Sequence, residues 1–243
     1  VISLEENSKM DEQEVALIVG AGNGLSASLA RTFSDQGMKI ALAARNTEKL
    51  TDIAGETDAK LFCCDATNLE QVNNLFSTVV TELGTPNVVV FNASARVRGA
   101  ITEINPDDVK EALLITSYGG FLVGQAAAKL MVPKNRGTIC FTGASAGVKG
   151  FPMSATFAMG KFGLRGLAQS MARELHPQNI HVVHVVVDGG IRSAEKNRME
   201  TQEDDPDKWL DPDAIASTYW HLHTQHRSSW SWEIEVRPWV EKF

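Results

Sequence analysis

Short apolar runs rich in β-branched residues alternate along the chain with longer stretches in which apolar residues recur at helical spacing. The apolar runs predict strands at residues 14–19, 39–44, 60–64, 87–91, 138–142 and 180–187. The stretches between them predict helices over 24–36, 47–54, 69–83, 106–131 and 157–175, with a further helix over 213–225 and a last strand within 231–243. Strands that are apolar throughout are typical of a parallel sheet covered on both faces. The pattern therefore predicts an α/β fold, a doubly wound parallel sheet of about seven strands with helices on both faces.

Two segments depart from this alternation. Residues 1–13 are acidic and polar, so they do not read as a signal peptide, and we interpret them as a flexible leader in which Met10 is a candidate alternative start. Residues 14–243 are predicted to form a single domain. Within it, residues 188–213 carry two prolines and an acidic run, which is typical either of a lid or insertion near a ligand site or of a solvated acidic loop.

Composition narrows the class of protein. The 243 residues carry 23 Lys and Arg against 30 Asp and Glu, a net charge of −7, which argues against nucleic acid as a partner. Three cysteines, Cys63, Cys64 and Cys140, make a poor disulfide framework and favour reduced thiols in a cytoplasmic protein. No apolar run approaches the roughly 20 residues that span a bilayer, so no membrane association is expected.

A glycine-rich segment, Gly20-Ala21-Gly22-Asn23-Gly24-Leu25-Ser26, follows the first predicted strand and opens the first predicted helix. Glycines let the backbone turn tightly and approach a pyrophosphate, and the helix N-terminus supplies free N–H groups with a partial positive charge. A glycine triplet alone is weak evidence, but here it has the strand–turn–helix context that a dinucleotide site needs.

These features resemble the short-chain dehydrogenase/reductase family from about residue 14 to the end of the chain. That family carries Gly-x-x-x-Gly-x-Gly after the first strand; Gly20 and Gly24 match its first two glycines, and Ser26 stands in place of the third. The resemblance implies a Rossmann-like NAD(P)-binding domain, hydride transfer between the nicotinamide and a small carbonyl or alcohol substrate, and assembly as a homodimer or homotetramer.

The end of the second predicted strand bears on the choice of cofactor. An acidic residue there would bind the adenosine ribose hydroxyls and repel a 2′-phosphate. This chain has Ala43-Ala44-Arg45-Asn46, without the carboxylate and with a guanidinium that pairs well with phosphate. We therefore expect NADP(H) in preference to NAD(H), the alternative being that Arg45 is only a solvated surface charge.

Further positions carry over from the family motifs. Asp65 matches the acidic residue that contacts the adenine amino group, and Asn92 matches the second Asn of Asn-Asn-Ala-Gly. Ser193 stands at the Thr of the Pro-Gly-x-x-x-Thr turn that holds the nicotinamide amide, in which Asp188 replaces the Pro. The resemblance thus implies the following cofactor-binding residues: Gly20, Asn23, Gly24, Leu25, Arg45, Asp65, Ala66, Asn92, Lys161, Gly189, Ile191 and Ser193.

The catalytic positions depart most from the family. Family members use a Tyr-x-x-x-Lys pair on one helix face, a Ser that polarises the substrate oxygen and an upstream Asn. Here Lys161 is in place, but Phe157 holds the Tyr position and Thr116 the Asn position, while the Ser position falls on Ala144 with Ser145 next to it. The candidate catalytic residues are therefore Lys161, Ser145, Phe157 and Thr116.

Three interpretations of this site stay open. Ser145, Ser154 or Lys161 itself supplies the proton, and a Lys beside an apolar ring is expected to have a lowered pKa. Alternatively, the reaction needs no such acid, or the protein is a catalytically silent NADP(H)-binding sensor or scaffold. A positioned general acid contributes about 10²–10⁴ in rate, so loss of the Tyr weakens catalysis without necessarily abolishing it. We favour the oxidoreductase.

Two groups outside these motifs have competing interpretations. Arg96 and Arg98 follow the fourth predicted strand, where a ligand enters such a fold; they either favour an anionic substrate or, as the simpler interpretation, are surface charges. His221, His223 and His226 lack helical ligand spacing and further ligands, so no metal site is expected.

All five tryptophans lie in the last 35 residues of the chain. Such a cluster is typical of packing or, at a chain end, of a subunit interface, for which Trp230, Trp232 and Trp239 are the candidates. His181 and His184, in the sixth predicted strand, are interpreted as packed strand residues.

Overall fold

The computed structural model describes residues 13–242, so the predicted leader falls almost entirely outside the described residues. Seven strands form one sheet in the order β3-β2-β1-β4-β5-β6-β7, and every neighbouring pair is parallel. The strands are β1 Val15–Val19, β2 Lys39–Ala44, β3 Lys60–Cys63, β4 Val88–Phe91, β5 Gly137–Thr142, β6 Ile180–Val187 and β7 Glu233–Val236. The predicted fold class, a doubly wound parallel sheet of about seven strands, is confirmed.

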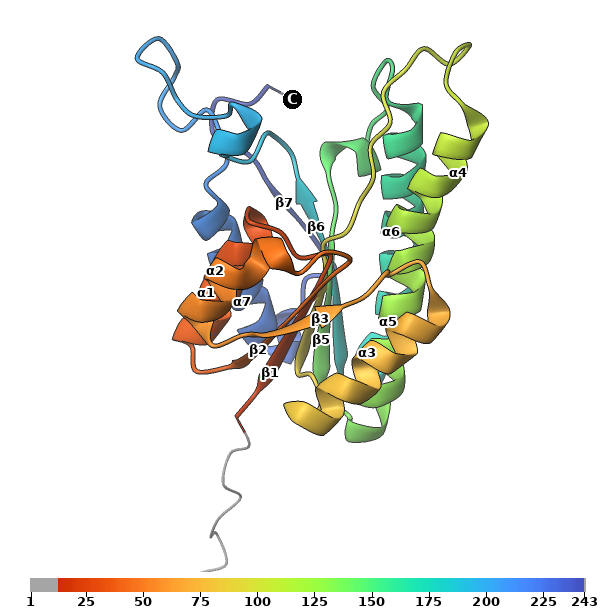
Figure 1. Ribbon diagram of the computed structural model, residues 1–243, viewed down its shortest axis with the longest axis vertical. Coiled ribbons are helices and arrows are strands. Elements are labelled where there is room, and N and C mark those ends of the chain that lie inside the picture. The colour runs from red at the N-terminus through yellow and green to blue at the C-terminus, as the bar shows by residue number, and fades with distance from the viewer. Residues whose placement is uncertain (1–12, 243) are drawn as a thin grey trace, which may run out of the picture.

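Helices cover both faces of the sheet (Figure 1). One layer contains α1 Leu25–Asp35, α2 Thr51–Thr57 and α7 Pro212–Thr224; the other contains α3 Leu69–Glu82, α4 Pro106–Leu113, α5 Gly119–Met131 and α6 Ala155–Leu175. Successive side chains of a strand point to opposite faces. Accordingly Leu17 packs into the core beneath α3, α5 and α6, whereas Ile18 packs into the core beneath α1, α2 and α7.

The helix predicted over residues 106–131 is interrupted by a π-helical turn at Leu114–Tyr118, which separates α4 from α5. Ser117 in this turn donates a hydrogen bond to the carbonyl of Gly160 on α6 over 2.9 Å. A Cβ atom on Gly160 would lie 3.0 Å from the Cβ of Thr116, so the glycine permits this close packing. The turn therefore fixes the part of α6 that carries the next residue, Lys161.

The direction in which successive strands are added to the sheet reverses between β1 and β4. From β1 the strands run outward through β2 to β3, and from β4 they run outward on the other side to β7. In such folds ligands bind outside the carboxyl ends of the strands at this switch point. The segment after β6 crosses the same end of the sheet, where Ile191 bridges Leu210 and Ser193 bridges Arg198 (Figure 1). No helix among residues 13–242 is both long enough and apolar enough to cross a membrane.

Candidate functional site

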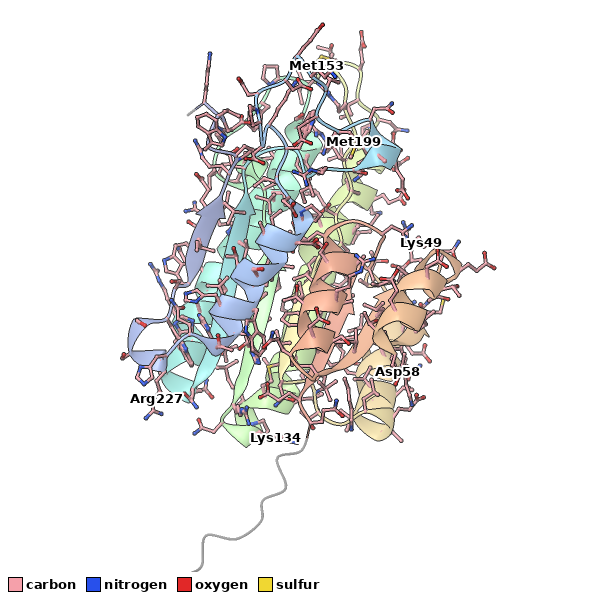
Figure 2. The ribbon with its side chains drawn as sticks, turned by 90° about the vertical axis from the view of Figure 1, so that its left-hand side faces the viewer. Lys49, Asp58, Lys134, Met153, Met199 and Arg227 are labelled. Atoms are coloured by element: carbon pink, nitrogen blue, oxygen red, sulfur yellow. The ribbon has the colours of Figure 1, made fainter. Side chains whose placement is uncertain are left out.

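Two adjoining cavities, of about 480 and 460 Å³, lie at the carboxyl ends of the strands. They share the lining residues Gly20, Gly22, Lys49, Asn92, Ser94 and Lys196 and so form one elongated groove. Figure 2 shows Met199, from the segment after β6, toward this end of the molecule, with Asp58, Lys134 and Arg227 at the opposite end. The volume of each cavity is in the range of small-molecule and cofactor sites.

The glycine-rich turn occupies the middle of the groove. Gly20 has a φ of +81°, and a Cβ atom on it would lie 2.4 Å from the backbone nitrogen of Ala93, so only glycine fits there. A Cβ atom on Gly22 or Gly24 would meet no other atom within 4 Å, because these two glycines border open space. No side chain caps the start of α1, which leaves its first N–H groups free to bind an anion.

Ser26, which stands in place of the third glycine, has a structural partner. Its hydroxyl accepts a hydrogen bond of 2.8 Å from the side-chain amide of Asn92, after β4. Ser26 is buried and Asn92 lines both cavities. The substitution of Ser for Gly thus ties the first turn of α1 to the β4 loop across the switch point.

The cavity of about 460 Å³ contains the residues expected at the adenosine end, Arg45, Asp65 and Ala66. The carboxylate of Asp65 accepts hydrogen bonds from the backbone nitrogen and the hydroxyl of Thr67, at 2.9 and 2.8 Å. The backbone hydrogen bond from Thr67, together with the charge of Arg45, holds the pKa of Asp65 below its usual value, so this carboxylate is ionised at neutral pH.

The larger cavity contains Lys161, which is only 3% exposed. Its Nζ donates a hydrogen bond of 2.6 Å to the backbone carbonyl of Thr142, at the end of β5. Burial lowers the pKa of Lys161 to about 7, because the protein interior disfavours the charged ammonium. A group with a pKa near 7 is well suited to give or take a proton at neutral pH.

Phe157 lies one helical turn before Lys161 and lines the same cavity. The centroid of its ring lies 5.8 Å from the Nζ of Lys161 and 5.2 Å from the guanidinium carbon of Arg96. Arg96 also donates a long hydrogen bond, 3.4 Å, to the hydroxyl of Ser154. An aromatic ring without a hydroxyl therefore lies within cation–π range of two cations, and its match to the family's Tyr position stays a prediction.

The other two catalytic candidates are placed differently. Ser145 begins a 3₁₀ turn, Ser145–Gly147, and lines the larger cavity beside Ala144. Thr116 is buried and lines neither cavity, and its hydroxyl accepts a hydrogen bond of 3.1 Å from the backbone nitrogen of Ala95. Thr116 therefore supports the β4 loop from behind, and a catalytic role for it stays a prediction.

All twelve of the cofactor-binding residues expected from the sequence line one or both cavities. Sequence reasoning missed four cations that line them as well: Lys49, Arg192, Lys196 and Arg198. Lys49 lies four residues after Arg45, and this short separation along the chain could have indicated it. Nothing in the sequence places Lys196 and Arg198, because their positions depend on the path of the segment after β6.

That segment turns sharply at its start. Gly189 has a φ of +149°, and a Cβ atom on it would lie 2.8 Å from Pro238. Asp188, where the family has Pro, is 3% exposed and pairs with Arg237 and, at 3.6 Å, with Lys149. The two cations thus compensate the charge of the buried Asp188. After the turn, Ser193 still lines the cavity.

The strand β6 behind the site carries two buried histidines, His181 and His184. The Nδ1 of His184 lies 2.9 Å from a carboxylate oxygen of Glu233, which also forms a two-point ion pair with Arg165 at 2.6 and 2.7 Å. Burial lowers the pKa of both histidines. The ring of His181 stacks on Trp230 with 4.6 Å between centroids.

The remaining interface and metal candidates have local partners. Trp230 and Trp232 are partly buried and pack within the chain, whereas Trp239 is 74% exposed. His223 contacts the hydroxyl of Thr138 at 3.0 Å and the carboxylate of Glu14 at 3.1 Å. An interface role for these tryptophans stays a prediction.

Comparison with known proteins places this geometry in a family. The family model described as short chain dehydrogenase matches residues 14–204. A curated relative, "(21S)-21-acetoxyl-apo-melianone synthase SDR" from Melia azedarach, is 31% identical over 176 residues, which cover 70% of this chain and 65% of that protein.

Two solved structures resemble the whole fold. A short-chain dehydrogenase from Rhodopseudomonas palustris is 32% identical with a TM-score of 0.80, over 93% of this chain and 99% of that one. A metagenomic short-chain oxidoreductase in complex with NADP is 26% identical with a TM-score of 0.79, over 93% and 98% of the two chains. With the family model matching most of its length, the chain belongs to the short-chain dehydrogenase family.

Proposed function

We propose that the protein is an NADP(H)-dependent oxidoreductase that transfers a hydride between the nicotinamide and a small carbonyl or alcohol substrate. The observation that carries the proposal is the single groove that joins the glycine-rich turn to the buried Lys161. The similar metagenomic oxidoreductase, which was solved in complex with NADP, supports the same occupant.

The preference for NADP(H) rests on the charge at the adenosine end. Arg45 follows β2 directly, where an acidic residue would exclude a 2′-phosphate, and Lys49 lines the same cavity. Asp65 is the acidic side chain in that lining, and in this proposal it is assigned to the adenine amino group. Two cations at this end favour a cofactor with the additional phosphate.

The proton donor in this proposal is Lys161. When bound, NADPH would supply the hydride that reduces the carbonyl carbon. The ammonium of Lys161 gives a proton to the carbonyl oxygen, so that an alcohol forms and Lys161 becomes neutral until solvent reprotonates it. Its pKa of about 7 suits both directions of this transfer. Ser145, on the wall of the same cavity, is assigned to orient the substrate oxygen.

The segment 188–213 acts as a lid in this proposal. Ile191, Ser193 and Arg198 from this segment line the cavity that holds Lys161. Residues 14–243 then form one NAD(P)-binding domain, with the lid as an insertion between β6 and α7.

Titration of the purified protein with NADPH and with NADH, followed by nicotinamide fluorescence, tests the proposal. We expect NADPH to bind at least about tenfold more tightly than NADH, and Arg45→Asp to remove most of that difference, since each tenfold change corresponds to about 1.4 kcal/mol. Arg173→Asp, on the exposed surface of α6, is the matched control for the charge change and should keep the preference.

Two outcomes would count against the proposal. Failure to bind either nucleotide would remove the cofactor assignment altogether. Tight NADPH binding without oxidation of NADPH by any of a broad panel of carbonyls would instead favour a catalytically silent nucleotide-binding protein.

A further inference from the structure

The cavity that holds Lys161 is strongly cationic, although the chain as a whole has a net charge of −7. Its lining includes one carboxylate, from Glu195, and six cationic side chains: Lys49, Arg96, Lys161, Arg192, Lys196 and Arg198. A concentration of one sign of charge in a cavity attracts ligands of the opposite sign. The phosphates of a bound cofactor would account for only part of this positive charge.

Four of the six cations have another assignment. Lys49 and Lys196 line both cavities and so lie along the path of the cofactor phosphates. Arg192 pairs with Asp211 at 2.8 Å and with Glu200 at 3.3 Å. Lys161 bonds to the carbonyl of Thr142 and is the proposed proton donor.

Arg96 and Arg198 remain. Both line the cavity of Lys161 and neither lines the adenosine cavity. Among residues 13–242, neither guanidinium has a carboxylate within 4 Å. Two guanidiniums without an acidic partner at one cavity are free to pair with a negatively charged group of a ligand.

Aromatic rings hold both guanidiniums. Arg96 lies over the ring of Phe157 at 5.2 Å, and Arg198 over the ring of Trp209 at 5.8 Å, both within the range of cation–π attraction. The backbone of Arg198 is also fixed by reciprocal 2.9 Å hydrogen bonds with Ser193. Less conformational freedom is therefore lost when these side chains bind a ligand.

The two residues come from separate parts of the chain. Arg96 belongs to the loop between β4 and α4, and Arg198 to the segment between β6 and α7, and these run on opposite sides of the end of the sheet (Figure 1). The cavity is thus lined by one guanidinium from each of these two segments. Such planar groups bind carboxylate and phosphate through two parallel hydrogen bonds.

We propose that Arg96 and Arg198 form an anion-binding subsite, and that the substrate carries a carboxylate or phosphate group close to its reacting carbonyl or alcohol. This inference rests on the proposed function for the identity of the cofactor. It adds the class of substrate. It also gives a role to Phe157, which replaces the family's Tyr, because the ring of Phe157 supports Arg96.

Binding to the NADP⁺-loaded protein tests the subsite without requiring turnover. The probes are matched pairs that differ in the anionic group: phenylglyoxylate and its methyl ester, 2-oxobutyrate and its methyl ester, and dihydroxyacetone phosphate and dihydroxyacetone. We expect the anion of at least one pair to bind at least about tenfold more tightly than its neutral partner, with the carboxylate and phosphate pairs identifying which group is preferred.

Arg96→Gln and Arg198→Gln should each reduce that preference by about tenfold or more while leaving NADP⁺ affinity within about twofold of the wild type. Arg98→Gln is the matched control, because Arg98 is exposed on the same loop as Arg96 and lines neither cavity. Preserved NADP⁺ binding together with equal binding of anions and neutral partners, or with no binding of any probe, would overturn the subsite alone. If the wild-type protein does not bind NADP⁺, the proposed function is overturned instead.

Discussion

The Nζ of Lys161 lies 2.6 Å from the backbone carbonyl oxygen of Thr142, so the last residue of β5 accepts a hydrogen bond from a side chain of α6. The side chain that donates this bond is almost completely buried. A carbonyl dipole compensates only part of the hydration that an ammonium loses on burial. The ammonium form is therefore destabilised, and the proton becomes available near neutral pH.

Lys161 should give the protein a measurable pH-dependent stability. Its pKa is about 7 in the fold against 10.5 for the exposed side chain, so between these values the unfolded chain binds one proton more. Stability from this residue thus rises with pH between about 7 and 10.5 and is flat below about 7, with a slope of at most about 1.4 kcal/mol per pH unit.

Urea unfolding of the apoprotein at several values between pH 6 and pH 10 measures this slope. The difference between wild type and Lys161→Met should grow in favour of the wild type as the pH rises. Lys129→Met, at an exposed position of α5, controls for the loss of a lysine and should show no such trend. Parallel pH profiles for wild type and Lys161→Met would mean that Lys161 keeps an ordinary pKa.

Phe157→Tyr should increase the reduction of neutral carbonyl substrates. A hydroxyl on this ring would lie near Lys161 and Arg96, whose charges favour its ionised form and lower its pKa. A positioned general acid contributes about 10²–10⁴ in rate, and we expect an increase in kcat/KM of about tenfold to a hundredfold.

Steady-state oxidation of NADPH with a panel of neutral aldehydes and ketones measures this effect. Phe162→Tyr is the matched control, because Phe162 is on the same helix but is 43% exposed and lines neither cavity. An unchanged rate in Phe157→Tyr would show that a missing hydroxyl does not limit the reduction of these substrates.

Gly20→Ala should destabilise the fold, whereas Gly22→Ala should affect only the groove. At Gly20 the φ of +81° is strained for alanine, and the new methyl would meet the Ala93 backbone at 2.4 Å. Strain and overpacking together suggest a loss of about 3 kcal/mol. At Gly22 a methyl meets nothing within 4 Å but enters the space assigned to the cofactor.

Thermal unfolding and NADPH titration of the two variants separate these effects. Gly20→Ala should lower Tm by several degrees, while Gly22→Ala should keep Tm and weaken NADPH binding. Equal Tm values for both variants would contradict the close approach between β1 and the β4 loop.

The elements themselves were largely predictable from the sequence. The first six strands lie within one residue of the predicted bounds, because a strand buried on both faces leaves a continuous apolar run. Differences arise at the ends of helices. The helix predicted over 47–54 begins as a 3₁₀ turn at Glu48–Leu50 and continues to Thr57. It ends at Asp58, which has a left-handed φ of 50°. The π-helical turn at Leu114–Tyr118 had no sequence signal, since its geometry depends on packing against α6.

The sequence by itself determined the parallel α/β sheet, the glycine-rich turn and those groove residues that directly follow a strand, such as Arg45, Asp65 and Asn92, because in this fold ligands bind at the carboxyl ends of the strands. Tertiary structure alone decided which of these side chains meet. It buries Lys161 and bonds it to Thr142, turns Thr116 away from the cavity, and sets Arg96 and Arg198 at the same cavity. These relationships join segments separated by up to about a hundred residues, and desolvation and charge pairing depend on distances in space that no local pattern of residues records.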